Sequence, residues 1–337
     1  MMWSRMRAYF NQAGAKAVVL MYHRVCILKT DPWQLAVSPG NFESQIKMLK
    51  KNFKVLPLYR LEEQLRIGKL KHKSVYITFD DAYTDNYLNA RPILEHYNCP
   101  ATFFVPSHFI GKEQLFWWDA LEAIILHSPD LPYQLTLLID DKSHEFYLKP
   151  ERLTNDVIKK QEAWKWPAPP PTRRCELYLK IWEILQQLSH NKIVKVINDL
   201  QKWAGSSCRH TPADCTMTDV QLKDFASNKL FSYGVHTHTH PALASCSPER
   251  QFQEIAVNKK YLIEQGYPVI NAVAYPYGNY NDASIKVAGQ NGMKMGFSTK
   301  REVVSRDSMA LSLGRVQVYN TEGSVLKKEL TQLFKTE

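Results

Sequence analysis

The first third of the chain alternates short apolar runs with segments whose apolar residues recur every three or four positions. Residues 15–23, 74–79 and 101–106 are apolar runs rich in β-branched or aromatic residues, and they predict buried strands. Residues 38–52 and 84–97 have the spacing of amphipathic helices. Strand, helix and strand at this spacing indicate parallel βαβ units.

The pattern changes between residues 114 and 215. Residues 116–126 and 176–188 predict helices, and residues 131–148 predict a hairpin. A proline-rich stretch, residues 164–175, interrupts the block. Because this region breaks the α/β alternation, we expect an insertion or a subdomain.

The α/β alternation resumes after the insertion. The further strand candidates are 230–236, 271–278, 295–299 and 313–319, and the further helices are 248–265 and 281–292. We therefore expect one α/β domain in two parts, flanked by an extension and a tail. The expected divisions are 1–16 (extension), 17–113 (first part), 114–215 (insertion), 216–325 (second part) and 326–337 (C-terminal tail).

Composition narrows the class of protein. Of the 337 residues, 45% are apolar and 23% are charged, which is ordinary globular usage and excludes disordered and collagen-like chains. The formal net charge of +10 could attract acidic glycans, an anionic membrane or nucleic acid. We find no nucleic-acid motif, so we expect no nucleic-acid partner and interpret the charge as a basic, solvated surface.

Cysteines and apolar runs bear on location. The six cysteines are widely spaced without a CxxC pair, which favours free thiols in a reducing compartment. The apolar run at residues 17–21 is too short for the core of a signal peptide, and no run approaches the length that spans a bilayer. We expect a cytoplasmic protein and leave open its peripheral attachment to the inner membrane.

Two adjacent carboxylates, Asp80 and Asp81, follow the predicted strand 74–79. Successive strand residues point to opposite faces, so both can serve one site only where the chain leaves the strand. Catalytic groups of α/β barrels gather at that carboxyl edge. A divalent metal would let one carboxylate bind it while the other stays ionised as a base. Alone, the pair could instead cap the next helix.

A second stretch places three histidines at alternate positions, His236, His238 and His240. In a helical turn, His236 and His240 share a face and can chelate one ion, whereas in an extended chain all three line one side. Pro241 disfavours the α region for His240, so the spacing leaves both arrangements open, as well as a polar loop without metal. Two histidines and one aspartate form a reasonable zinc set with a position open for water.

Four motifs now stand in order: LMYHRV at 20–25, TFDD at 78–81, HTHTHP at 236–241 and AYPYG at 274–278. The last three resemble motifs of the polysaccharide deacetylases of carbohydrate esterase family four, the NodB-homology superfamily. The first resembles the circularly permuted branch, which includes deacetylases of biofilm poly-N-acetylglucosamine. The resemblance implies a deformed (β/α) barrel, here with a large, mostly helical insertion.

The resemblance also implies the metal centre. Asp80 matches the family's general base, and Asp81 matches its metal-binding carboxylate. His236 and His240 match the two histidine ligands, so His238 is not expected to bind. The implied cofactor is a divalent metal, most readily Zn²⁺, with Co²⁺ and Ni²⁺ as alternatives because these ligands discriminate weakly.

The remaining catalytic residues follow from the same resemblance. His23 matches the general acid, although a histidine at a strand end can also be structural. The backbone N–H of Tyr277 matches an oxyanion-hole donor. Arg315 is a candidate to orient the base, because the third motif lacks the arginine often found near Tyr275. Ala82 replaces a common glycine, which is tolerable if its φ is negative.

Aromatic residues are candidates for substrate binding, because sugar rings stack on aromatic faces. The candidates are Trp117, Trp118, Tyr275 and Tyr277, although such residues more often fill cores. The resemblance implies a metal-dependent hydrolase that removes N-acetyl groups from an amino sugar in a polysaccharide or glycoconjugate. The alternatives are an O-acetyl ester hydrolase on a glycan and a catalytically silent sugar-binding protein. The sequence leaves the sugar and the oligomeric state open.

Overall fold

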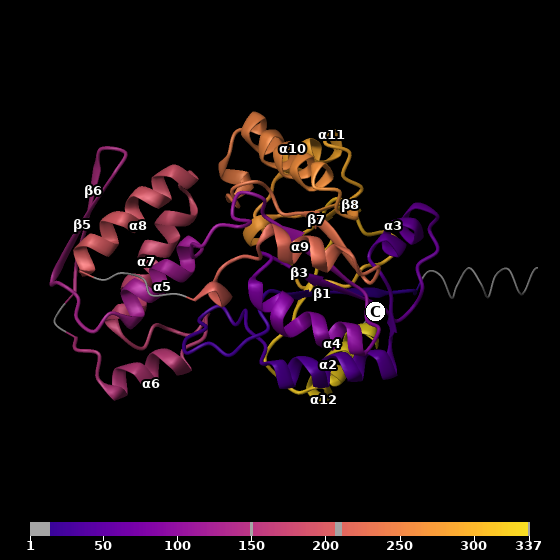
Figure 1. Ribbon diagram of the computed structural model, residues 1–337, viewed down its shortest axis with the longest axis horizontal. Coiled ribbons are helices and arrows are strands. Elements are labelled where there is room, and N and C mark those ends of the chain that lie inside the picture. The colour runs from indigo at the N-terminus through magenta and orange to yellow at the C-terminus, as the bar shows by residue number, and fades with distance from the viewer. Residues whose placement is uncertain (1–13, 149–150, 206–210, 336–337) are drawn as a thin grey trace, which may run out of the picture. The chain divides into compact units, whose positions relative to one another are not determined.

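The computed structural model describes residues 14–148, 151–205 and 211–335, and the chain divides into two units (Figure 1). The barrel unit holds the chain up to Ile27 together with Leu35–Gly111 and Thr216–Glu337. The insertion unit holds Leu28–Gln34 and Lys112–Cys215. Its longer piece nearly coincides with the expected insertion, whereas its short piece was not expected. The expected extension, 1–16, lies outside the described residues except for its last three.

A parallel sheet in the order β10-β1-β3-β4-β7-β8-β9 forms the barrel unit, with β2 paired to β3. Leu313 pairs with Phe297 of β9 and Val316 pairs with Leu20 of β1, so one short segment links the two ends of the sheet. The predicted deformed (β/α) barrel is confirmed. The strands are β1 (Ala17–Tyr22), β2 (Lys54–Val55), β3 (Ser74–Phe79), β4 (Ala101–Val105), β7 (Phe231–Val235), β8 (Val269–Ala274), β9 (Met295–Phe297) and β10 (Val316–Gln317).

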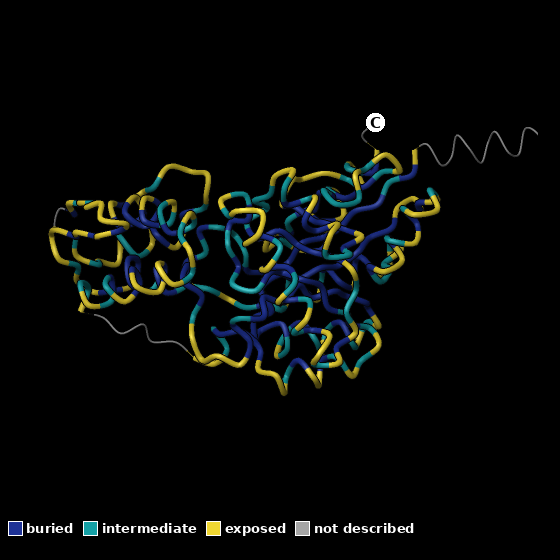
Figure 2. Tube along the Cα trace, turned by 90° about the horizontal axis from the view of Figure 1, so that it is seen from above, coloured by how far each residue is buried: buried dark blue, intermediate teal, exposed yellow. Residues whose placement is uncertain are grey.

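The strands alternate between two buried clusters, as the pleat requires. In β1, Val18 and Leu20 pack with residues of the surrounding helices, whereas Ala17 and Val19 join Phe104 in a second cluster drawn from several strands. Figure 2 shows buried residues running through the middle of the barrel unit, with exposed residues at its periphery. The helices of this unit are α2 (Pro39–Asn52), α3 (Tyr59–Arg66), α4 (Arg91–His96), α9 (Asp219–Ala226), α10 (Pro248–Glu264), α11 (Asp282–Gln290) and α12 (Gly323–Lys335), with a π-helix at Asn86–Ala90 and 3-10 turns at Leu243–Ser245 and Pro276–Gly278.

The end of the chain corrects one predicted boundary. Residues 326–337 were expected to form a tail, but 326–335 belong to α12, which packs against α2. Leu326, Leu330 and Phe334 are buried in the main cluster of the barrel unit. Their spacing of four residues lines one face of a helix, so this segment completes the core.

The insertion unit is mostly helical, as predicted. Its helices are α5 (Trp117–His127), α6 (Asn155–Ala163), α7 (Arg173–Gln186) and α8 (His190–Ala204), and β5 (Gln134–Ile139) with β6 (Lys142–Tyr147) forms the hairpin, followed near the end of the unit by a 3-10 turn at Pro212–Asp214. The Trp33 indole donates to the hydroxyl of Tyr178 at 2.8 Å, which holds the 28–34 segment in this unit. In the described parts of both units, no helix is long and apolar enough to cross a membrane.

Candidate active site

The paired carboxylates lie where β3 ends. The N–H of Asp80 still donates to the carbonyl of Tyr22 at 3.0 Å, one step beyond the last residue of β3. The next two residues leave the strand abruptly, with φ of 68° at Asp81 and 53° at Ala82. Both carboxylates therefore reach the same edge of the sheet and both are buried. The condition under which alanine was expected to be tolerable at position 82, a negative φ, is not met, so an alanine holds a left-handed conformation that favours glycine.

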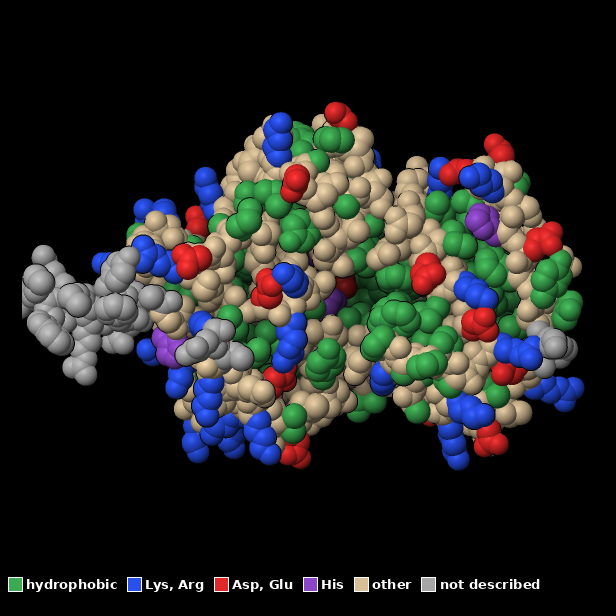
Figure 3. All heavy atoms as spheres, turned by 180° about the vertical axis from the view of Figure 1, so that it is seen from behind, with side chains coloured by type: hydrophobic (Ala, Val, Ile, Leu, Met, Phe, Trp, Pro, Cys, Tyr) green, Lys and Arg blue, Asp and Glu red, His purple; other side chains and the backbone are tan. Residues whose placement is uncertain are grey.

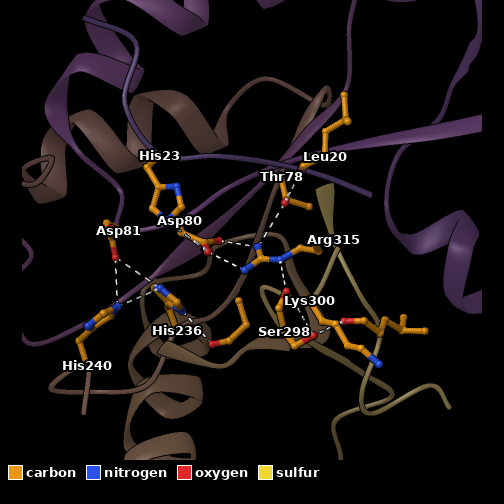
Figure 4. Close-up of polar contacts among 12 residues, drawn as sticks. Leu20, His23, Thr78, Asp80, Asp81, His236, His240, Ser298, Lys300 and Arg315 are labelled. Atoms are coloured by element: carbon orange, nitrogen blue, oxygen red, sulfur yellow. Dashed lines mark hydrogen bonds and ion pairs between the residues drawn. The ribbon is translucent and has the colours of Figure 1, made fainter. Parts of the chain in front are cut away.

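Asp81 faces two histidines in a buried cluster (Figure 4). Its Oδ1 lies 3.3 Å from Nε2 of His236 and 3.2 Å from Nε2 of His240, and the two Nε2 atoms are 3.2 Å apart. Ligands about 2.0–2.1 Å from a tetrahedral Zn²⁺ are separated by about 3.3 Å, so the three atoms fit such an ion. Nδ1 of His236 lies 2.8 Å from the carbonyl of Ala274, which orients Nε2 toward the cluster.

The loop after β7 explains which histidines converge. Thr237 and His240 have φ of 65° and 56°, so the chain turns tightly and brings His236 and His240 together. His238 is not part of the cluster. Its Nδ1 lies 2.9 Å from the hydroxyl of Ser107 instead.

Asp80 pairs with Arg315, which comes from the other end of the chain (Figure 4). Two 2.7 Å hydrogen bonds join the guanidinium to the two carboxylate oxygens, and Nε of Arg315 donates to the carbonyl of Ser298 at 3.1 Å. Burial by itself raises the pKa of Asp80, but Arg315, with smaller contributions from the histidines, brings that pKa below its ordinary value. A lowered pKa favours the ionised form of Asp80, and its carboxylate is oriented by Arg315, separate from the cluster of Asp81, His236 and His240.

His23 follows the last residue of β1 and lies beside Asp80. Its Nε2 is 3.9 Å from Oδ2 of Asp80, and its side chain keeps 13% exposure. Its carbonyl accepts a hydrogen bond from Asn86 at 2.9 Å. Burial lowers the pKa of His23, and the opposing effect of Asp80 and Asp81 does not restore it.

The aromatic candidates divide. Tyr277 has a φ of 59° in the turn after β8, and its ring lies 4.7 Å from that of His240. Tyr275 is fully buried, donates from its hydroxyl to the carbonyl of Leu311 and stacks on Tyr280, so its ring belongs to the core rather than to a surface for sugars.

Trp117 and Trp118 lie on α5 in the insertion unit, and each is only 7% exposed. Trp118 stacks on Phe116, and Trp117 packs against Trp182. These ring contacts are those of packing residues. Contact of the two tryptophans with substrate stays a prediction.

The family model described as polysaccharide deacetylase matches residues 67–148 and 180–296, which is more than half of the chain. The chain belongs to the polysaccharide deacetylase family. It is a hydrolase that acts on carbon–nitrogen bonds other than peptide bonds. The matched residues include the paired carboxylates, both clustered histidines and Tyr277, but not His23 or Arg315.

Individual relatives are distant but extensive. The chain is 23% identical over 292 residues to the poly-beta-1,6-N-acetyl-D-glucosamine N-deacetylase of Staphylococcus aureus, covering 84% of this chain and 68% of the relative. The structure of IcaB from Ammonifex degensii superposes with a TM-score of 0.56 at 18% identity, covering 94% and 97% of the two chains. The Streptococcus pyogenes deacetylase PplD gives 0.53 at 21% identity, covering 96% and 99%. At this identity, the two structures establish the deacetylase fold.

Proposed function

We propose that this member of the family removes N-acetyl groups from an amino sugar in a polysaccharide or glycoconjugate, using a divalent metal ion. The observation that carries the proposal is that two adjacent carboxylates have different partners. Asp81 faces two histidine nitrogens, whereas Asp80 faces a guanidinium. Similarity to the poly-beta-1,6-N-acetyl-D-glucosamine N-deacetylase of Staphylococcus aureus supports the N-acetylated substrate.

Asp81, His236 and His240 would hold the ion. Zn²⁺ is the first choice because it accepts one carboxylate and two imidazoles and leaves a position open, and Co²⁺ and Ni²⁺ accept the same ligands. When bound, the ion would polarise the acetyl carbonyl and lower the pKa of an attacking water.

Asp80 is the proposed general base. It takes a proton from the water that attacks the acetyl carbon, and its lowered pKa keeps it ionised at neutral pH. The two hydrogen bonds from Arg315 fix the plane of its carboxylate, so Arg315 acts through Asp80 as a positioning residue.

His23 is the proposed general acid. An amine leaves poorly until its nitrogen is protonated, so cleavage of an N-acetyl group needs a donor. His23 is suited to this step because its Nε2 lies 3.9 Å from Asp80 Oδ2, beside the proposed base, and its side chain keeps 13% exposure. The N–H of Tyr277 would donate to the developing oxyanion at the same edge of the sheet.

Metal content tests the proposal without a known substrate. We would measure it by elemental mass spectrometry in the metal-supplemented wild type, His240→Ala and His238→Ala. We expect about one metal ion per chain, lost in His240→Ala and kept in His238→Ala, whose ring lies outside the cluster. Metal-free wild type would overturn the metal centre.

Acetate release from N-acetylated and O-acetylated glycans then tests the reaction. We expect release from the N-acetylated sugar and its loss in His23→Ala. An ester leaves without protonation, so near-normal acetate release by His23→Ala, on O-acetylated glycan alone, would favour the O-acetyl esterase alternative instead.

We also propose that the protein works in the cytoplasm, attached to the inner membrane surface. Support comes from a basic edge, defined by Lys16, Lys54 and Lys73 at the starts of three neighbouring strands. The N–H of Lys54 donates to the carbonyl of Lys73 at 3.1 Å, and the N–H of Lys73 donates to that of Lys16 at 3.0 Å. Figure 3 shows a group of lysine and arginine side chains on the barrel unit. The five described cysteines form no disulfide, which suits a reducing compartment.

Vesicle sedimentation tests the membrane contact. We expect binding to vesicles that contain phosphatidylglycerol, weakened by salt and by changing all three lysines of the basic edge to Glu. The matched control changes three exposed lysines on helices α9, α10 and α11 of the same unit to Glu: Lys223, Lys260 and Lys286. Equal losses in both triple variants would contradict a specific basic edge, and native protein found only in the periplasm or medium would contradict the location.

A further inference from the structure

Helix α10 carries an unusual row of polar residues on its inward face. Gln251, Glu254 and Asn258 are 0%, 2% and 0% exposed. Their spacing places them on the face where an amphipathic helix normally carries apolar residues. Burying polar groups there is unfavourable unless each finds a partner, so their partners indicate what the row does.

Glu254 holds the middle of the histidine loop. One of its carboxylate oxygens accepts the N–H of His238 at 2.9 Å and that of Thr239 at 2.7 Å. The other accepts the hydroxyl of Thr239 at 2.7 Å and pairs with Arg250 at 2.5 Å. Two successive backbone N–H groups converging on a buried carboxylate form charge-assisted hydrogen bonds, which are stronger than neutral ones.

The rest of the row holds the two ends of the same loop. The amide of Asn258 donates to the carbonyl of Thr237 at 2.5 Å and to that of Val105, at the end of β4, at 2.7 Å. The amide of Gln251 donates to the carbonyl of Cys246 at 3.0 Å. One face of α10 thus anchors the loop before, at and after its turn.

This loop requires an external anchor because its backbone is strained. Thr237 and His240 both have positive φ, which residues with side chains adopt only at a cost in free energy. This conformation brings the Nε2 atoms of His236 and His240 to 3.2 Å from each other. If the loop relaxed to ordinary φ values, the two nitrogens would move apart.

We propose that Glu254 is a positioning residue that preorganises the metal ligands by holding the strained loop between them. The inference rests on the metal centre of the proposed function and adds to it a residue that binds no metal. Its carboxylate binds the N–H groups of His238 and Thr239, the hydroxyl of Thr239 and the guanidinium of Arg250. It acts through the geometry of the two histidines.

The matched control is Asp85, another carboxylate that is 2% exposed. It pairs with Arg24 at 2.8 Å and accepts the N–H of Val25 at 2.9 Å, so it holds the loop after His23 rather than the metal ligands. Losing either carboxylate removes an ion pair with an arginine, which is exposed for Arg250 and buried for Arg24, together with hydrogen bonding to backbone N–H groups. Only loss of Glu254 is expected to disturb the metal site.

The experiment measures the Zn²⁺ dissociation constant of the full chain by competition with a chromophoric chelator. We expect Glu254→Ala to weaken Zn²⁺ binding about 10- to 100-fold, as is typical of outer-shell partners of ligands. Glu254→Gln keeps two acceptor sites for the backbone N–H groups and should stay within about 3-fold of wild type. Asp85→Ala should bind Zn²⁺ as the wild type does. If Glu254→Ala fails to fold, Asn258→Ala, which frees Thr237, takes its place with the same expected loss.

The outcomes separate the inference from the proposed function. Wild-type affinity in folded Glu254→Ala would overturn the inference, and so would an equal loss of affinity in Asp85→Ala. A wild type that binds no Zn²⁺ or other divalent ion would instead overturn the metal centre itself.

Discussion

Among the residues that the structure describes, two arginines are completely buried, one in each unit, and their partners differ. Arg315 in the barrel unit places its guanidinium on both oxygens of Asp80. Arg174 in the insertion unit instead donates to backbone carbonyls. Its four acceptors belong to Ile125, Ser128, Pro129 and Glu151. Two arginines of equal burial therefore bind different partners, a carboxylate for Arg315 and backbone carbonyls for Arg174.

The difference teaches what a buried guanidinium can control. Arg315 lowers the pKa of the neighbouring Asp80 carboxyl, so it favours the charged form of the proposed general base. The guanidinium of Arg174 donates to carbonyls, and burial lowers its own pKa despite Glu151 and Asp130. Carbonyls cannot ionise, so Arg174, at the start of α7, joins the end of α5 to the segment before α6 and serves packing.

The largest effect should follow from Arg315→Met. Without the guanidinium, burial would raise the pKa of Asp80, so the base would be protonated at a pH where it is now ionised. We expect kcat/KM to fall about 100- to 1,000-fold, the scale of one general-base contribution. The acid limb of the pH–rate profile should also move to higher pH, because a raised pKa means that Asp80 ionises only at higher pH.

Arg315→Lys sharpens this prediction. Lysine restores the charge but cannot form the paired hydrogen bonds, so it should recover the acid limb more than the rate. An unchanged pH profile in Arg315→Met would show that Arg315 supports the fold alone, as Arg174 does, and the comparison would fail.

Arg174→Met should change stability rather than chemistry. It leaves four carbonyls without this donor and should lower the free energy of unfolding by about 3 kcal/mol, since one unsatisfied buried group costs about 1–3 kcal/mol. Urea denaturation measures this loss. The fraction that remains folded should keep kcat/KM within about 2-fold of wild type, as expected for a residue outside the site. A fall in kcat/KM as large as that of Arg315→Met would contradict the separation of roles.

Metal binding should also distinguish the two units. Zn²⁺ at 100 times its dissociation constant should stabilise the barrel unit by about 2.7 kcal/mol, because it binds only the folded site. Hydrogen exchange, with and without a chelator, would locate the gain in protection. Protection that rises equally in the insertion unit, or that persists in His240→Ala, would contradict a site built from the barrel unit alone.

The smallest effect concerns the backbone that carries the paired carboxylates. Ala82→Gly removes a buried methyl group but relieves a left-handed alanine, which costs about 1–2 kcal/mol. These effects oppose each other, so the free energy of unfolding should change by less than about 1 kcal/mol. Ala90 is equally buried with a φ of −74°, so Ala90→Gly should cost about 1–2 kcal/mol. Equal losses at the two positions would show that Ala82 is unstrained.

Much of the site was predictable because its residues follow strands. Asp80 and Asp81 stand directly after an apolar run, and the edge of a parallel sheet is where such residues meet. Spacing could not choose between His238 and His240, because that choice depends on two positive φ values that histidine and threonine do not announce. The resemblance made the choice, and the geometry places His236 and His240 with Asp81.

Other features depend on contacts that the sequence does not show. Leu326, Leu330 and Phe334 have helical spacing, but only their packing against α2 makes α12 part of the core. The 28–34 segment joins the insertion unit through Trp33, a contact between residues far apart in sequence. Glu254 looked like one more charge on a long helix, although a polar residue every third or fourth position on its apolar face was a signal.

The pairing of Asp80 with Arg315 has a consequence for the synthesis and folding of each chain. The two residues are 235 positions apart, and the segment that bears Arg315 is also the one that links the two ends of the sheet. A chain still emerging from the ribosome has Asp80 long before it has Arg315, and contacts this distant form slowly. Arg315 can therefore orient Asp80, the proposed base, only after the sheet has closed. We therefore expect most of the hydrolytic activity to appear late in folding, after the segment that bears Arg315 has joined the sheet.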